Sequence, residues 1–399
     1  MIQIESQAPK VRFPVLNLGF RPFFALAALW AVISVGLWMG FFVFGWPFPA
    51  QGLSAVSWHA HEMVFGYALA VIAGFLLTAV RNWTNIQTPW GLPLLGLALL
   101  WLLARVGILW WGVLPPWLGM GAEALFILLL TVAVAWPVIR VRQWGQLPIV
   151  LKLLLFLPAS VAWHAGLLGW LEDGVRIGLY SGFYLVLALI FNMGRRVIPF
   201  FIERGVDDPD AALKNCTLVD RSNLLLFLAM AIIDVFIGWP QVVGILAAVL
   251  AVLNGLRLWG WHHPDIWRKR LLWVLYLGYA WLVVGFVLLA LGRFGLILPL
   301  LAVHAFAYGG IGMMTLGMMA RVSLGHTGRN VFEPPAMLTP VFALLMLGGL
   351  VRVFMPMLAP QHYTLWIALS QILWMLAFAG FAWRYLPMLW QARVDGRWG

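Results

Sequence analysis

Long apolar runs recur along the whole chain, and each has about the length that crosses a bilayer. Roughly 20 helical residues span the hydrocarbon core. Within the bilayer every backbone N–H and C=O must be bonded inside its own segment, so such runs fold as helices. We therefore predict a single all-α transmembrane domain over residues 1–399, with about twelve spans at 22–44, 58–80, 90–111, 117–139, 148–170, 177–201, 222–238, 239–260, 271–291, 296–320, 334–354 and 362–386.

Composition supports a polytopic membrane protein. The chain is 63% hydrophobic and only 10% charged, with a mean hydropathy of +0.94, which lies outside the range of soluble proteins. The first apolar run is too long for a signal-peptide core, so we interpret it as a retained span. The seventh and eighth spans are the hardest to divide, because only Gly238-Trp239-Pro240-Gln241 separates them.

The basic residues predict the orientation. With the N-terminus inside, all but four of the 25 Lys and Arg residues fall on inner segments, including Lys10 and Arg12. The positive-inside rule then places both termini in the cytoplasm. The net charge of +11 is accordingly a topology signal, and the absence of a soluble basic face argues against nucleic-acid binding. The four outer exceptions are Arg105, Arg176, Arg293 and Arg352.

Several chemistries are excluded by missing motifs. Cys216 is the single cysteine, so an intrachain disulfide, an iron–sulfur cluster and a thiolate zinc site are ruled out. No C-x-x-C-H motif is present for covalent haem attachment, and no G-x-x-x-x-G-K-[ST] motif for ATP binding. Cys216 lies in the inner loop Glu203–Arg221, which we interpret as a solvated connector or a short amphipathic helix.

The motif Trp58-His59-Ala60-His61-Glu62-Met63 opens the second apolar run. Ionisable side chains at this position cost several kcal/mol, so they are usually functional or firmly paired. Two residues apart on a helix, the imidazoles of His59 and His61 point roughly 200° apart and cannot chelate one ion. The motif predicts either two sites or one site and one structural hydrogen bond, and a pair of hydrated interfacial histidines is the alternative.

Other histidines share the predicted outer level. His164 and His304 lie about two turns inside the fifth and tenth spans, whereas His362 begins the twelfth and is interpreted as structural. Neutral imidazole is the commonest ligand of haem iron, copper and zinc, and a site between helices needs ligands at one depth. A lone buried histidine is more often a hydrogen-bonded core residue, so both interpretations stay open here. His262, His263 and His326 fall on the inner side.

The tenth span carries further polar residues. Tyr308 lies one turn beyond His304 and is expected to share its face, as a hydrogen-bond or proton partner. At the other end of the span, Arg321, His326 and Arg329 flank a glycine-bounded turn. This turn can hold an anionic group such as a haem propionate or a lipid phosphate. A tight basic loop is the simpler interpretation on chemistry alone.

Buried charges predict one ion pair. Arg105 and Glu123 are equidistant from the centre of the loop that joins the third and fourth spans, so an antiparallel hairpin brings them to one depth. Glu62 and Asp234 have no obvious partner in the sequence. Either can orient a ligand histidine or begin a proton path.

Several segments together resemble the NnrS family. They occur in the same order over nearly the whole chain: Leu18–Phe24, Trp58–Met63, Gly74–Val80, Asn82–Thr84, Asn192–Phe201, and the tenth span through Gly325–Arg329. Members of that family are multi-spanning bacterial inner-membrane proteins described as containing haem and copper and as belonging to the nitric oxide stress response. The resemblance implies this chemistry for the chain, whereas residue spacing alone indicates only a metal site.

Our hypothesis is a b-type haem, with copper as a further metal, in the outer half of the bundle. We expect His304 and one of His59 and His61 to ligate the haem. The other histidine of the pair would join His164 at copper or at a second haem. Glu62 and Tyr308 are the expected proton or orienting groups. The expected partners are nitric oxide or another diatomic ligand entering from the bilayer and an electron donor such as quinol.

Two other functions fit the sequence. A proton-coupled secondary transporter would use buried charges and histidines to carry protons. A haem-based sensor or protective redox protein would bind nitric oxide without turnover. The sequence does not decide between turnover and binding.

Overall fold

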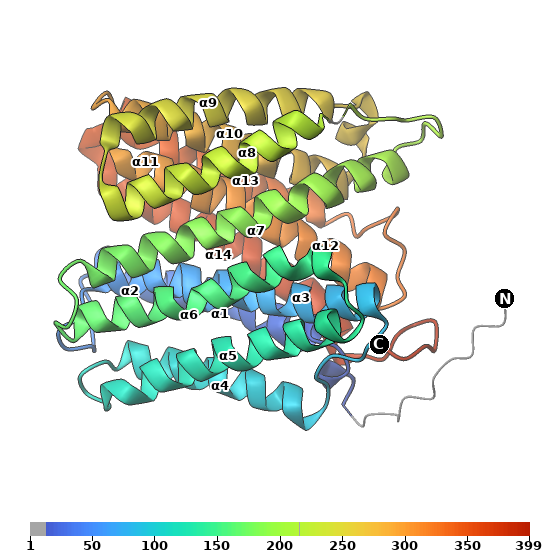
Figure 1. Cartoon of the computed structure of the whole chain (residues 1–399), viewed down its shortest axis with the longest axis horizontal. Helices are drawn as coiled ribbons and strands as arrows, with labels where there is room; N and C mark the ends of the chain where they lie inside the picture. The colour runs from blue at the N-terminus through green and yellow to red at the C-terminus, as the bar shows by residue number, and fades with distance from the viewer. Residues whose placement is uncertain (1–12, 215) are drawn as a thin grey trace.

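The computed structural model describes residues 13–214 and 216–399, and these form one bundle of long helices without a β-sheet (Figure 1). The predicted inner residues Lys10 and Arg12 lie outside the described part. The α-helices are α1 (Phe20–Phe42), α2 (Ala55–His61), α3 (Leu69–Thr84), α4 (Leu92–Leu109), α5 (Pro116–Arg140), α6 (Leu147–Leu167), α7 (Gly174–Gly205), α8 (Thr217–Ile232), α9 (Pro240–Gly260), α10 (Arg270–Arg293), α11 (Pro299–His304), α12 (Met313–His326), α13 (Leu338–Leu358) and α14 (Tyr363–Trp390).

The described chain contains three π-helical segments that continue α-helices. η2 (Glu62–Ala68) joins α2 to α3, η6 (Ala305–Gly312) joins α11 to α12, and η4 (Ile233–Ile237) ends the helix that α8 begins. Each segment has an ionisable residue of the apolar core at or next to its first residue: Glu62, Asp234 or His304. Such π-helical turns occur frequently at functional sites, so these three places are candidates for chemistry.

Eleven helices in the described part are long and apolar enough to cross a membrane, against the twelve predicted spans. The missing one is the predicted seventh span. Its residues do form a helix, α8 continued by η4, but they include Asp220, Arg221 and Asp234 and are therefore less apolar than the rest.

The position of the chain ends indicates that α8 also crosses. Arg21, at the start of α1, donates a hydrogen bond to the Gly399 carbonyl at 2.7 Å, so both ends of the described chain meet at one end of the bundle. An even number of crossings is needed for this, and Figure 1 shows α8 running the length of the bundle between α7 and α9. Gly238, at a φ of 78°, and Pro240 at the first turn of α9 make the sharp reversal.

The connector between α7 and α8 is shorter than the predicted Glu203–Arg221. α7 continues to Gly205 and α8 begins at Thr217, and the described residues between them are irregular, which agrees with a connector and not with an amphipathic helix. Asp220 belongs to α8 instead of the loop, where its carboxylate accepts a hydrogen bond from Arg257 at 2.5 Å. The acidic residues of this region are therefore partly structural.

The core is organised around α1 and the segment η2–α3. α1 packs against α3 and α14, and α4 to α7 follow one another around them (Figure 1). α10 packs on the segment α11–η6–α12, and α9 packs on α10. α7 lies between α6 and α8 and so joins the first and second groups of helices. The second and tenth predicted spans, which carry the H-x-H motif and His304, thereby lie in the interior of the bundle.

Cysteine labelling tests whether α8 crosses the membrane. Cys216 precedes α8 and is exposed, and Trp239, which follows η4, is 58% exposed. We expect a membrane-impermeant maleimide to label Trp239→Cys in a Cys216→Ala background from outside intact cells, and to label native Cys216 only after lysis. Trp170→Cys, between α6 and α7, is the control for the outer side. Labelling of positions 216 and 239 from one side would show that α8 does not cross.

Candidate functional site

The two histidines of the H-x-H motif point to opposite faces of α2, as their spacing predicts. The ring of His61 lies against Trp163 of α6, with ring centroids 3.9 Å apart. The ring of His59 instead stacks on Trp38 of α1, at 4.8 Å and nearly parallel. Ser54 directly precedes α2, and its hydroxyl accepts a hydrogen bond from the Ser57 N–H, which caps the helix. The motif therefore faces two separate surroundings.

On the His61 face lies a fully buried ion cluster made of His61, Glu62, Arg105 and Glu123. The Arg105 guanidinium bonds Glu62 at 2.9 Å with one nitrogen and Glu123 with another. The predicted Arg105–Glu123 ion pair is thus confirmed. Glu62, which has no obvious partner in the sequence, is the third member and also accepts a hydrogen bond from the Trp30 indole at 2.9 Å.

Close packing excludes water from this cluster. A Cβ atom at Gly66, one turn beyond Glu62, would lie 2.7 Å from the Trp30 indole nitrogen and 2.8 Å from the Glu62 carboxylate. Those distances are too short for any side chain there, so only glycine lets the two groups approach. The Gly66 carbonyl in turn accepts a hydrogen bond from Trp101 at 3.1 Å.

His61 is engaged at both ring nitrogens. Nδ1 lies 3.2 Å from Glu62 Oε1, and Nε2 lies 3.2 Å from Glu123 Oε1. Ionised carboxylates only accept hydrogen bonds, so this arrangement is satisfied when both nitrogens carry hydrogen. In that state His61 is a cation that balances the second carboxylate and has no lone pair for a metal. Its predicted role as a ligand would require the cluster to rearrange.

His164 presents a free nitrogen beside the same cluster. Its Nδ1 donates to the Ser160 carbonyl at 2.9 Å, and its Nε2 is buried without a hydrogen-bond partner among the described residues. A histidine fixed through Nδ1 with Nε2 open is the usual state of a metal ligand. The ring centroids of His164 and His61 are 5.9 Å apart, and the Ser160 hydroxyl donates to Glu123 at 2.5 Å.

On the opposite face of α2 lies His59, whose Nδ1 is buried and has no partner in the described part of the chain. His304, at the end of α11, donates from Nδ1 to the Leu300 carbonyl at 2.9 Å, while its Nε2 accepts a hydrogen bond from Arg352 of α13 at 2.9 Å. The structure therefore separates His59 from His61, and it brings His61 and His164 together beside the ion cluster.

Two metals are predicted at these histidines. The ring of His59 has one buried nitrogen without a hydrogen-bond partner in the described part of the chain, which is the state that a ligand needs. Among the described residues, no group of three or more His, Cys, Asp or Glu side chains has the geometry of a metal site. Haem binding and copper binding therefore both stay predictions.

Tyr308 does not contact His304 in the expected way. Its hydroxyl donates to the Ser370 carbonyl of α14 at 2.8 Å. The expectation assumed an α-helix, in which residues four apart share a face. Residues 305–312 are π-helical, with i→i+5 bonds, so Tyr308 is displaced from beneath His304. It ties η6 to α14 rather than serving His304 directly.

Arg321 and His326 lie at the far end of the same continuous helix, and Arg329 follows it in the loop. Arg321 is roughly 25 Å from His304 along the axis, at about 1.5 Å per residue, and the other two are farther. No haem ligated by His304 reaches them, so their predicted contact with that cofactor is corrected. His326 instead lies beside Asn82 at 3.4 Å, and Arg329 donates to Gln391 at 3.2 Å.

Sequence reasoning missed Arg352 and the partners of Asp234. Arg293 forms an ion pair with Asp234, which also accepts a hydrogen bond from the Tyr184 hydroxyl at 2.6 Å. The distribution of basic residues in the sequence could have indicated these contacts. Of the four basic residues on the predicted outer side, Arg105, Arg293 and Arg352 each bond a buried or half-buried side chain of the core. Arginines that oppose the positive-inside bias mark the polar sites of this bundle.

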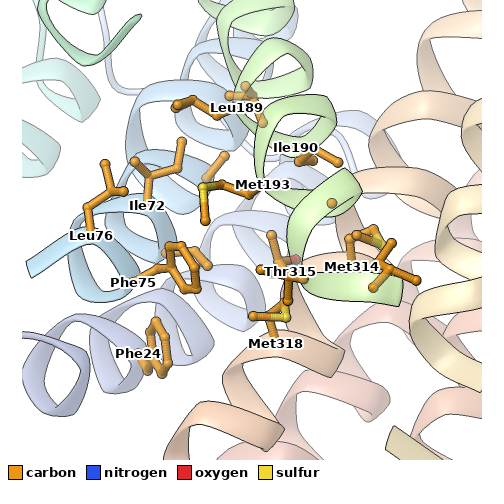
Figure 2. Close-up of a pocket in the computed structure, with 16 residues that line it drawn as sticks. Phe24, Ile72, Phe75, Leu76, Leu189, Ile190, Met193, Met314, Thr315 and Met318 are labelled. Carbon is orange, nitrogen blue, oxygen red and sulfur yellow. The ribbon is translucent and has the colours of Figure 1, made fainter. Parts of the chain in front are cut away.

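An apolar cavity lies between α1, α3, α7 and α12, deeper along the helices than the histidines (Figure 2). It has a volume of about 90 Å³, and no charged side chain or histidine lines it among the described residues. Phe75 and Met193 point into it from facing helices, with Met314 and Met318 on α12 (Figure 2). Thr315 is its one hydroxyl and is already bonded to Tyr67 at 2.5 Å.

One protein family matches this chain. The family profile described as NnrS protein covers residues 14–393, nearly the whole sequence. No curated protein matches the chain.

Removing one charge from the buried ion cluster should destabilise the protein strongly. Glu123→Gln leaves the cations Arg105 and His61 with one carboxylate, and an uncompensated buried charge costs about 3–5 kcal/mol. We expect a lower thermal unfolding midpoint in detergent. Arg176→Gln is the control, because its pair with Asp173 is exposed and worth about 0–1 kcal/mol. Equal midpoints for both variants would contradict a stabilising role of the cluster.

Proposed function

Because the chain belongs to the NnrS family, we propose that it is a haem protein of the bacterial inner membrane that binds or redox-processes nitric oxide. Family membership and the multi-span helical architecture both fit a membrane protein of the nitric oxide response. The single observation that supports haem binding most directly is the buried Nδ1 of His59, which has no hydrogen-bond partner in the described part of the chain and faces away from the ion cluster.

His59 and His304 would hold the haem, which when bound supplies an iron that takes a diatomic ligand and exchanges electrons. Each histidine is oriented by the protein. His59 is fixed by its stacking on Trp38, and His304 by its hydrogen bond to the Leu300 carbonyl. Arg352 donates a hydrogen bond to Nε2 of His304. If that nitrogen ligated the iron, the Arg352 guanidinium would be free to pair with a carboxylate of the cofactor.

The buried ion cluster positions the ligand histidines. Glu62 follows directly after the H-x-H motif and is bonded to Arg105 of α4, so the position of α2 depends on this contact. His61 anchors the other face of α2 to Glu123 of α5. We assign Glu62 and Tyr308 as positioning residues, since the partners of both are already satisfied within the protein. A proton-transfer role for either stays a prediction.

The apolar cavity gives the diatomic ligand a place within the bilayer. Nitric oxide is small and weakly polar, so it dissolves in hydrocarbon and needs no aqueous channel. The cavity wall offers almost no polar surface, which favours such a ligand over a charged or hydrogen-bonding one (Figure 2). Quinol as the electron donor stays a prediction.

A proton-coupled transporter is the second candidate. It is favoured by the buried ion cluster, because buried ionisable groups in a membrane often mark ion or proton pathways. A transporter of this kind would be colourless, whereas a haem protein absorbs strongly in the visible range. An absorption spectrum of the purified protein separates the two functions at once.

Replacing either proposed ligand should remove the haem. We expect His59→Ala and His304→Ala to lose the Soret band of the purified protein, with iron analysis on the same samples. His263→Ala is the matched control, because His263 lies in the loop before α10 and interacts with Asp208 and Asp265. Full haem content in both variants would overturn the assignment, and a featureless spectrum of folded wild-type protein would favour the transporter.

Turnover distinguishes an enzyme from a sensor. With a chemical reductant present, we expect the haem-loaded protein to consume nitric oxide at a steady rate that falls to background in His304→Ala. A nitric oxide electrode measures this rate. Stoichiometric binding, seen as a shift of the haem bands without continued consumption, would identify a non-catalytic sensor or protective protein instead.

A further inference from the structure

A second, basic pocket lies at the opposite end of the bundle from His304. It is formed where α10 begins, between the end of α12 and the loop that follows it, and has a volume of about 40 Å³. Four of its lining residues are cationic, namely Arg268, Lys269, Arg270 and Arg321. No carboxylate lines it among the described residues. This group of residues is called the basic pocket below.

The neighbouring acids neutralise only part of this charge. Lys269 pairs with Asp207 at 2.6 Å, and the exposed Arg268 lies 3.7 Å from Asp265. Arg270 donates to the Thr339 hydroxyl and the Pro334 carbonyl, which are neutral acceptors. The pocket therefore keeps an excess of positive charge.

Arg321 is the cation that most needs an anionic partner. Its guanidinium lies over the Phe201 ring, 3.7 Å from the centroid, and no carboxylate in the described part of the chain pairs with it. The side chain is half-buried at the pocket wall. Holding Arg321, Arg268 and Arg270 around one space costs repulsion, which an anion in that space relieves. The positive end of the α10 dipole adds to the same field.

We propose that the basic pocket binds a phosphate-bearing anion. Arg321 and Arg268 would contact its oxygens, because guanidinium groups bind phosphate through paired, charge-assisted hydrogen bonds. The pocket lies at the level where the helices end, which lipid headgroups also occupy. The same chemistry is presented by the headgroup of phosphatidylglycerol and by a free phosphate. This site is independent of the proposed haem, from which it is separated by most of the length of α12.

The test compares variants that remove positive charge from the same end of the bundle. Arg268→Gln and the double variant Arg268→Gln/Arg321→Gln alter the pocket. Arg204→Gln is the control, because Arg204 is an exposed arginine at the end of α7 and does not line the pocket. Each full-length protein is purified, its thermal unfolding is checked, and retained lipids are quantified by native mass spectrometry after exchange from mixed phosphatidylglycerol and phosphatidylcholine vesicles. Inorganic phosphate is titrated into delipidated protein by calorimetry.

We expect wild-type protein and Arg204→Gln to retain phosphatidylglycerol over phosphatidylcholine. The double variant should bind at least about tenfold more weakly, since each lost charge-assisted bond is worth about a factor of ten. Arg268→Gln, which changes an exposed side chain, should show an intermediate loss without unfolding. Binding of inorganic phosphate without a lipid preference, weakened in the same variants, would identify a soluble phosphate as the ligand. The proposal is overturned if wild-type protein binds neither probe, or if Arg204→Gln loses as much binding as the double variant.

Discussion

The buried contact of Arg105 with Glu62 and Glu123 is the interaction on which the histidine-bearing half of the bundle depends. It joins η2, α4 and α5 through three side chains that are almost completely buried. A pair of charges in such surroundings gains little net stability, because removing both from water is costly. It gives specificity instead. Only one rotation and one depth of α2 satisfy Arg105, and that placement also determines where His59 and His61 point.

The π-helical segments adjust those directions further. η2 begins at Glu62 and η6 begins after His304, so the two helices that carry the candidate ligands both change their winding beside the site. A π-helical turn moves the following residues around the axis relative to an α-helix. Tyr308 shows the consequence, since it reaches Ser370 of α14 instead of His304. The site histidines thus lie on helices whose winding changes beside the site and whose side chains bond to neighbouring helices.

The bundle separates two kinds of chemistry by its length. One end holds histidines, balanced charges and apolar walls, which suit a buried cofactor and a diatomic ligand. The other end holds Arg321 and the basic residues at the start of α10, which suit an anion at the membrane surface. The continuous helix from Pro299 to His326 connects both ends. Because this helix is so long, one cofactor does not contact both His304 and Arg321. The sequence alone allowed such a shared cofactor.

Several features follow from the sequence because they are local. Helical spans follow from apolar runs of bilayer length, the opposed faces of His59 and His61 from the angle per residue, and the Arg105–Glu123 pair from the symmetry of a hairpin. The predicted seventh span, 222–238, is a helix as well, but it begins five residues earlier at Thr217 and is not among the eleven described helices apolar enough to cross.

The tertiary structure decided what depends on contacts between distant segments. Three side-chain bonds join residues that are 43 or more positions apart in the sequence, namely Glu62 with Arg105, Asp234 with Arg293, and His304 with Arg352. No periodicity in one segment encodes the rotation of another, and the π-helical turns that set these rotations leave no pattern in the apolar runs. The sequence by itself therefore determined the helices and the residue types of the site, whereas packing alone decided which histidine faces which partner.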